Sequence, residues 1–246
     1  MIAAKQKYRL SLENSINFMD KRILGLLAAL LATSIFGFNH TIAKELMPDI
    51  LSPNALLYCR VFGAAVLFWF ISFFLKWEKV EIKDFKLIVI CAFFGMGLNM
   101  ITSLHGLYNS TPINSAIITT LAPIFIFLIS VILIKEKITK RKYLGVFIGF
   151  CGTLTLILLN EKSVINAPNI NLGNFYFFIN SLSYALYFVL VKPLTKKYNM
   201  ITIMKWLFLF SIFINIPFGL IEFTEINWVE ISGVSLLKIS YVVICT

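Results

Sequence analysis

Long apolar runs separated by short polar loops fill the chain from residue 23 to its last residue. A helix needs about 20 mostly apolar residues to cross the roughly 30 Å of hydrocarbon in a bilayer, because each residue adds about 1.5 Å. Seven runs qualify, namely Ile23–Ile42, Pro53–Leu75, Phe85–Leu107, Pro112–Ile134, Tyr143–Leu159, Leu172–Val191 and Ile201–Ile221. An eighth begins near Ser235 and reaches Thr246 after only about half a crossing, so we expect the chain to end inside a membrane helix. The pattern predicts an all-α, multi-span membrane protein.

Composition supports this prediction. The chain is 59% hydrophobic and 14% charged, whereas soluble domains are about half apolar and a quarter charged. None of the 12 acidic residues falls within the seven runs. A carboxylate at the centre of a membrane helix costs about 3 kcal/mol on insertion scales, so the runs are compatible with lipid as they stand.

The basic residues alternate along the chain and predict its orientation. Eighteen of the 22 Lys and Arg residues form four clusters, and two apolar runs separate each cluster from the next. The clusters are Lys5, Lys7, Arg9, Lys21 and Arg22; Lys76, Lys79, Lys83 and Lys86; Lys135, Lys137, Lys140, Arg141 and Lys142; and Lys192, Lys196, Lys197 and Lys205. Because basic loops stay in the cytoplasm, we expect a cytoplasmic N-terminus in the plasma (inner) membrane. The same rule explains the net charge of +10 without nucleic acid as a partner.

Two smaller expectations follow from this orientation. Lys44 would lie in an outer loop, and Lys205 would extend from the end of a span toward water. Trp69 and Trp77 would mark the cytoplasmic end of the second span.

A polar outer loop divides the chain into two units after five spans. The first unit comprises a cytoplasmic segment, 1–22, and a first repeat, 23–160. The second comprises an outer linker, 161–171, and a partial second repeat, 172–246. A shift of 148 residues places Gly25 on Gly173, Thr33 on Ser181 and Lys44 on Lys192. Because the shift crosses an odd number of spans, the second copy would be inverted, as in many secondary transporters.

Several motifs resemble the EamA-type branch of the drug/metabolite transporter superfamily. In the first repeat these are Gly37, Asn39, Lys44, Pro48 or Pro53, and Arg60; from the fourth span on they are Thr111, Pro123, Glu136, Gly145, Gly149 and Gly152. Lys135 stands where the family usually has Gly. The resemblance implies a bundle of two inverted five-helix repeats around a central substrate cavity, with the second repeat incomplete here.

Arg60 is the strongest candidate for a substrate ligand. It is the only fixed charge well inside a span, roughly 10 Å from the outer end of its helix. Charged groups at such depth usually face the bundle interior or an aqueous cavity. The alternative is an arginine that extends outward or bonds to a neighbouring helix carbonyl.

Polar residues on three other spans complete the candidate set. Asn39 and His40 lie in the first span, Asn99 and Ser103 share one face of the third, and Tyr184 belongs to a polar face of the sixth with Asn180, Ser183 and Tyr187. Hydrogen bonding between helices is the simpler explanation for each of them taken alone. Pro123 is a candidate hinge, and Gly145, Gly149 and Gly152 are candidates for close helix packing.

The leading hypothesis is a secondary transporter, an exporter or permease, that moves a small metabolite by alternating access. An inactive or partial fragment of such a transporter is the main alternative. A membrane-embedded enzyme is less favoured, because the chain has two His, no acid within a span and no HExxH or GxSxG motif. The spacing of Cys59, Cys91, Cys151 and Cys245 suits no metal site, so we expect no metal or cofactor. The expected partners are the lipid bilayer and the substrate, with a homodimer left open.

Overall fold

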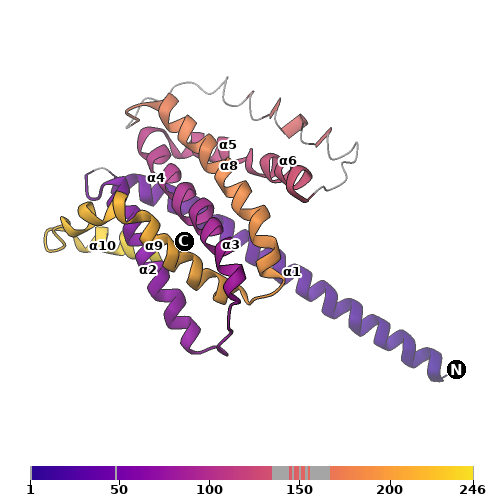
Figure 1. Cartoon of the computed structure of the whole chain (residues 1–246). Helices are drawn as coiled ribbons and strands as arrows, with labels where there is room; N and C mark the ends of the chain where they lie inside the picture. The colour runs from indigo at the N-terminus through magenta and orange to yellow at the C-terminus, as the bar shows by residue number, and fades with distance from the viewer. Residues whose placement is uncertain are drawn as a thin grey trace.

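Every regular element in the computed structural model is a helix, within residues 2–47, 49–134, 144–145, 147–149, 151–152, 155 and 167–245, which the structure describes (Figure 1). The elements are α1 (Ile2–Leu46), α2 (Pro53–Phe73), α3 (Ile82–Ala92), the π-helix η1 (Phe93–Leu98), α4 (Asn99–Asn109), α5 (Pro112–Thr119), α6 (Ala122–Ile134), α8 (Ile170–Thr195), α9 (Met200–Thr224) and α10 (Gly233–Ile244). The predicted all-α class is confirmed.

Six segments in this part of the chain are long and apolar enough to cross a membrane. They are Ile23–Leu46, Pro53–Phe73, Ile82–Asn109, Pro112–Leu133, Ile170–Thr195 and Met200–Thr224. They coincide with six of the seven predicted spans, and α10 is a shorter apolar helix where the eighth run was predicted. The predicted fifth span, Tyr143–Leu159, falls mostly outside the described residues. The chain is therefore a multi-span integral membrane protein.

Side-chain caps set where most of the spans begin. Ser52 accepts a hydrogen bond from the backbone N–H of Ala55 at the start of α2, and Thr111 accepts one from Asn114 at the start of α5. Proline occupies the first turn of both helices. Such caps satisfy N–H groups that have no partner within the helix, and proline has no N–H to satisfy there. The first residues of α2 and α5 could therefore be predicted from the sequence.

Two spans depart from a regular α-helix. The third changes to a π-helix at η1, which contains Gly95 and Gly97. The fourth is interrupted at residues 120–121, between α5 and α6, immediately before Pro123. Proline cannot donate to the carbonyl four residues earlier, so the helix opens at this point. Pro123 thus lies at a break in the span, while its role as a hinge stays a prediction.

The spans pack in pairs that connect the two predicted units. α2 packs mainly on α9, α4 on α8, and α1 on α10. Further contacts join α2 to α10, and α3 and η1 to α9. An exchange of spans one, two and three with spans six, seven and eight turns each contact into another of the set. The pair of α4 with α8 becomes that of α10 with α1, the pair of α2 with α10 becomes that of α9 with the third span, and the pair of α2 with α9 maps onto itself. This pairing supports the inverted repeats, which stay a prediction together with their boundaries.

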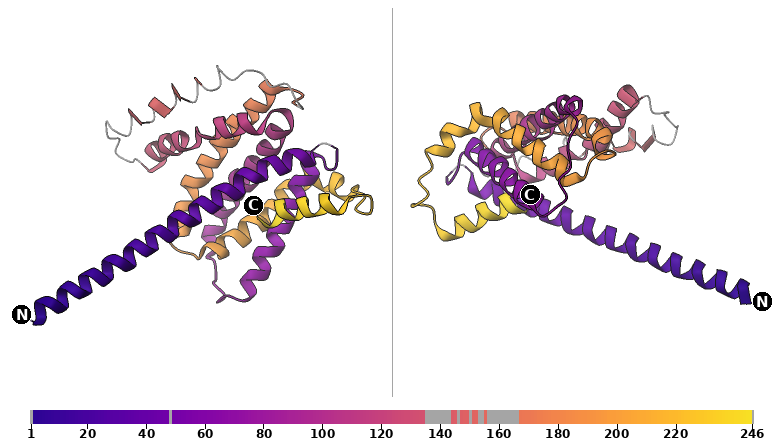
Figure 2. Two further views of the ribbon diagram at one scale, coloured as in Figure 1. Left: turned by 180° about the vertical axis from the view of Figure 1, so that it is seen from behind. Right: turned by 60° about the horizontal axis from the view of Figure 1, so that its bottom comes forward.

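The N-terminal half of α1 projects away from the other helices (Figures 1 and 2). α1 is continuous from Ile2 to Leu46, so no helix break marks the predicted boundary at residue 22. Its last turn includes Lys44, which corrects the placement of Lys44 in a loop. The side chain of Lys44 donates to carbonyls of α4 and its C-cap, which holds the end of α1 in helical form against that helix.

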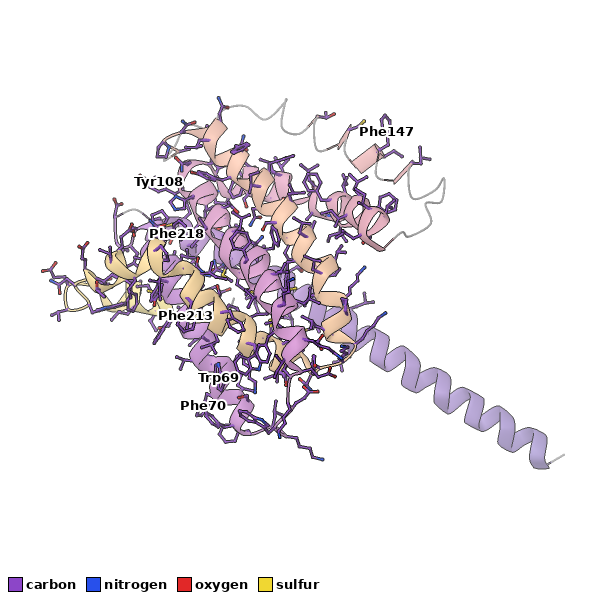
Figure 3. All side chains as sticks on the ribbon, in the orientation of Figure 1. Trp69, Phe70, Tyr108, Phe147, Phe213 and Phe218 are labelled. Atoms are coloured by element: carbon purple, nitrogen blue, oxygen red, sulfur yellow. The ribbon has the colours of Figure 1, made fainter. Side chains whose placement is uncertain are left out.

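Polar contacts join neighbouring segments at each end of the bundle. At one end, Lys197 and Tyr198 contact Asp84, at 3.0 Å and 2.8 Å. At the other, Lys238 pairs with Glu45 at 2.6 Å, and Ser52 donates to Glu222. Trp69 lies toward the first end of the molecule and Tyr108 toward the second (Figure 3).

Candidate substrate cavity

A cavity of about 410 Å³ lies between the two predicted units. Side chains of α1, α2, η1, α4, α5, α6 and α8 form its wall. The lining residues are Phe36, Asn39, His40, Ala43, Arg60, Gly95, Met96, Asn99, Met100, Ser103, Leu104, Leu107, Thr119, Ala122, Asn180, Ser181, Tyr184 and Tyr187. Small-molecule sites typically have this size and this mixture of apolar walls with a few polar groups.

All six residues predicted as substrate ligands line this one cavity, namely Asn39, His40, Arg60, Asn99, Ser103 and Tyr184. They come from four different helices, α1, α2, α4 and α8. The structure thus brings the predicted set together, although contact with a substrate stays a prediction for each residue.

Arg60 is buried against the cavity without a partner of opposite charge. Its side chain is 9% exposed, and it makes no hydrogen bond or ion pair with any described residue. Its Nε is fully buried and unpaired. One alternative to a substrate ligand was an Arg60 that bonds to a carbonyl of a neighbouring helix. Within the described part of the chain, no carbonyl accepts a hydrogen bond from Arg60.

Asn39 presents a second unpaired group. It is 2% exposed, and its Oδ1 has no hydrogen-bond donor within reach. Buried polar groups without partners are rare in native proteins and often mark a place where water or a ligand binds. The cavity wall therefore includes a buried unpaired donor, Nε of Arg60, and a buried unpaired acceptor, Oδ1 of Asn39.

Asn99, in contrast, is largely used between helices. Its Nδ2 donates to the carbonyl of Asn180 at 3.1 Å, and Asn180 Nδ2 donates back to the carbonyl of Asn99 at 2.7 Å. Ser183 donates to the carbonyl of Phe94 in η1 at 2.7 Å. These bonds hold α8 against the irregular third span, as the simpler explanation for such residues expects.

The two histidines lie in different surroundings. His40 Nδ1 lies 3.1 Å from the carbonyl oxygen of Phe36, and because a carbonyl only accepts, Nδ1 is the donor. The neutral ring therefore keeps Nε2 as an acceptor at the cavity. His105 does not line the cavity and lies with Nε2 2.8 Å from Asn54 Oδ1, while Asn54 Nδ2 donates to Glu222 at 2.7 Å.

Several wall residues were not predicted from the sequence. Phe36, Met96, Met100 and Thr119 look like ordinary lipid-facing or packing residues in a membrane helix. The 148-residue shift could have indicated Phe36, because it places Phe36 on Tyr184. It also places Asn39 on Tyr187, and all four residues line the cavity. Equivalent positions in the first and sixth spans thus face the same space.

Within the described residues, glycines of spans other than the fifth bring helices close together. A Cβ on Gly95 would lie 2.6 Å from the ring of Tyr187, so glycine is needed there for α8 to approach η1. A Cβ on Gly149 would lie 3.7 Å from Ile124, and one on Gly145 or Gly152 would meet no described atom within 4 Å. Much of the surrounding segment is outside the described residues, so the packing role of these three glycines stays a prediction.

No cluster of three or more His, Cys, Asp or Glu side chains that could hold a metal ion occurs within the described residues. Cys59 and Cys91 are buried and unpaired, in α2 and α3. The polar chemistry around the cavity therefore comes from Arg60, amides, hydroxyls and one imidazole.

The fold and this cavity define a class, that of multi-span helical membrane proteins with an internal polar site. Comparison with known proteins gives the family. Residues 23–158 match the EamA-like transporter family, and the chain belongs to that family.

Three relatives, all named uncharacterized transporters, illustrate the similarity. YetK of Bacillus subtilis is 26% identical over 80% of this chain and 60% of its own length. A protein of Archaeoglobus fulgidus is 31% identical over 70% of this chain and 59% of its own, and YyaM of B. subtilis is 28% identical over 70% and 57%. The chain thus spans about three fifths of the length of the relatives it matches.

Proposed function

We propose that this chain is a secondary transporter, an exporter or permease, that moves a small metabolite by alternating access. The observation that carries the proposal is the cavity, where six polar residues selected from the sequence meet between the two predicted repeats. In secondary transporters the substrate binds near the bilayer midplane, at the interface between repeats. The names of the relatives support the same class of activity.

The wider setting belongs to the proposal as well. The chain would lie in the plasma (inner) membrane with its N-terminus in the cytoplasm, and its partners would be lipid and a small molecule. A membrane-embedded enzyme is not supported, because the polar groups that the described residues contribute to the cavity include no nucleophile paired with a base and no carboxylate pair. Homodimer formation and the absence of a nucleic-acid partner stay predictions.

A metabolite screen tests the transport proposal. Cells that produce the 246-residue chain are compared by mass spectrometry with cells that produce a variant whose cavity is filled, Ser103→Phe. Val89→Phe is the matched control, because Val89 is an exposed residue on the same span and is not part of the cavity wall. We expect the wild-type chain and Val89→Phe to change the cellular level of the same metabolite, and Ser103→Phe to abolish the change.

The screen can also contradict the proposal. If all three proteins insert into the membrane in equal amounts and no metabolite level differs from that of cells without the chain, the chain is not an active transporter on its own. An inactive fragment would then be the better description.

A further inference from the structure

We propose that the cavity binds a small organic monoanion, a carboxylate, through the guanidinium of Arg60. This inference rests on the proposed transport function and specifies its substrate class. The protein leaves the positive charge of Arg60 unbalanced at the cavity.

Three other buried or half-buried cations of the described chain have clear partners, whereas the half-buried Lys192 has none and lies in the last turn of α8, outside the cavity wall. Lys44 donates to three carbonyl oxygens, at 2.7 Å, 2.8 Å and 2.9 Å, and Lys238 pairs with Glu45. Lys205, 2% exposed, lies over the ring of Trp77 with Nζ 4.3 Å from its centroid. Arg60 is nine-tenths buried and has no comparable partner. An isolated charge in a low-dielectric interior is strongly unfavourable, so a counter-charge from outside the chain would bind with large gain.

The sign and number of charges select a monoanion. Among the described residues no acidic side chain lines the cavity, and Arg60 is the one fixed charge in the wall. His40, the one histidine among the described wall residues, donates Nδ1–H to a carbonyl and presents Nε2 as an acceptor when neutral. One carboxylate balances one guanidinium, whose planar fork matches the two carboxylate oxygens. A doubly charged phosphate ester would leave one negative charge without a partner.

The remaining groups describe the rest of the ligand. The free Oδ1 of Asn39 calls for a hydrogen-bond donor such as a hydroxyl or ammonium group. Other parts of the wall are apolar, formed by Met96, Met100 and Leu104 among others. The expected ligand is therefore a carboxylate with one nearby donor and an apolar body.

Matched ligands test the charge requirement directly. The full chain is purified, and its binding of 3-phenyllactate is compared by calorimetry with that of 3-phenyllactamide, which keeps the shape and hydroxyl and lacks the charge. The aliphatic pair 2-hydroxyisocaproate and its amide repeats the comparison with a smaller body. We expect the wild-type protein to prefer each carboxylate by about tenfold to hundredfold, the range for hydrogen bonds to a charged partner.

Variants at and beside Arg60 separate binding from folding. Arg60→Gln should lose the preference for carboxylate over amide, and Arg60→Lys should keep part of it because the charge remains. Cys59→Ala, a buried neighbour on α2 that does not line the cavity, should keep the full preference. If Arg60→Gln does not fold, the wild-type ligand pairs and Arg60→Lys still decide the question.

The outcomes distinguish this inference from the transport proposal. Equal binding of carboxylate and amide by the wild-type chain, or binding of neither, overturns the anion site. If the metabolite screen then finds a neutral or cationic substrate, transport stands and the anion site falls. If carboxylates bind selectively and no transport is detected, the transport proposal falls and the anion site stands.

Discussion

The ammonium group of Lys44 acts as a cap supplied by one helix to the end of another. It donates to the carbonyl oxygens of Leu107, Tyr108 and Ser110, which lie at the C-terminal end of α4. Carbonyls in the last turn have no partner within their own helix and carry the negative end of the helix dipole. All three N–H donors of the lysine are therefore used in a structural role.

Removal of this cap should destabilise the fold. We expect Lys44→Met to lower the free energy of unfolding by about 1–3 kcal/mol, because it leaves half-buried carbonyls unsatisfied. Lys192→Met is the matched control: Lys192 occupies the equivalent position at the 148-residue shift, is also half-buried, and makes no side-chain hydrogen bond with the described residues. Unfolding in a mixed detergent titration measures both variants, and equal losses would contradict the cap.

At this scale Arg60 lies at the cavity, as its depth in the span suggested, whereas the expectations for Lys44 and Lys205 were wrong, for physical reasons. A charge in the middle of an apolar run is conspicuous whatever surrounds it. Lys44 and Lys205 lie near the ends of runs, where extension toward water is the usual outcome. Lys205 is instead 2% exposed beneath Trp69 and Trp77, from the second span and the loop after it, and sequence alone does not reveal that contact.

Among the elements, α4 and α8 approach each other most closely at two glycines. A Cβ on Gly106 would lie 2.8 Å from the ring of Phe177. A Cβ on Gly173 would lie 2.7 Å from the backbone nitrogen of Ser110 and 2.8 Å from the carbonyl oxygen of Gly106. Backbone atoms at such distances cannot rotate out of the way as a side chain can. Close contact between small residues is a common basis of helix association in membranes.

A methyl group where α4 and α8 cross should push these two helices apart. We expect Gly173→Ala to destabilise the protein by about 1–3 kcal/mol, as overpacking in a tight interior does. Gly25→Ala is the control, because Gly25 is the equivalent position in the first span and a Cβ there would meet no described atom within 4 Å. The same detergent titration compares the two, and an unchanged Gly173→Ala variant would show that the crossing has room to adjust.

The positions of the spans and the break beside Pro123 were predictable, and the close contacts between helices were not. Length and hydropathy mark where a helix can cross lipid, and Ser52 or Thr111 before a proline marks where one begins. Close contacts at Gly95, Gly106 and Gly173 depend on which helix packs against each glycine, and no single helix sequence contains that information. The same holds for the apolar cavity wall, since Met96 and Met100 resemble lipid-facing residues until their neighbours are known.

Across the whole molecule, charge is distributed unequally between the two ends. The loop before α3 and the loop between α8 and α9 meet where Lys197 pairs with Asp84 and Asn199 N–H donates to Glu78. Both loops belong to predicted cytoplasmic clusters. The opposite end holds a hollow of about 670 Å³ whose wall includes Asp49, Glu222, Glu225 and Glu230 and, among the described residues, no lysine or arginine. Basic loops on one side and acidic ones on the other agree with the positive-inside rule.

Labelling of single cysteines tests this orientation. In a chain whose four native cysteines are replaced by alanine, Lys79→Cys reports on the loop between α2 and α3 and Asn227→Cys on the loop between α9 and α10, and both positions are exposed. If the N-terminus is cytoplasmic, a membrane-impermeant maleimide should label Asn227→Cys in intact cells and Lys79→Cys only after permeabilisation. The reverse pattern would place the N-terminus outside, and equal labelling of both would mean that the chain inserts in two orientations. The projecting part of α1 lies on the same side of the bundle as the loop between α2 and α3 (Figures 1 and 2), so the result also shows on which side of the membrane that part lies.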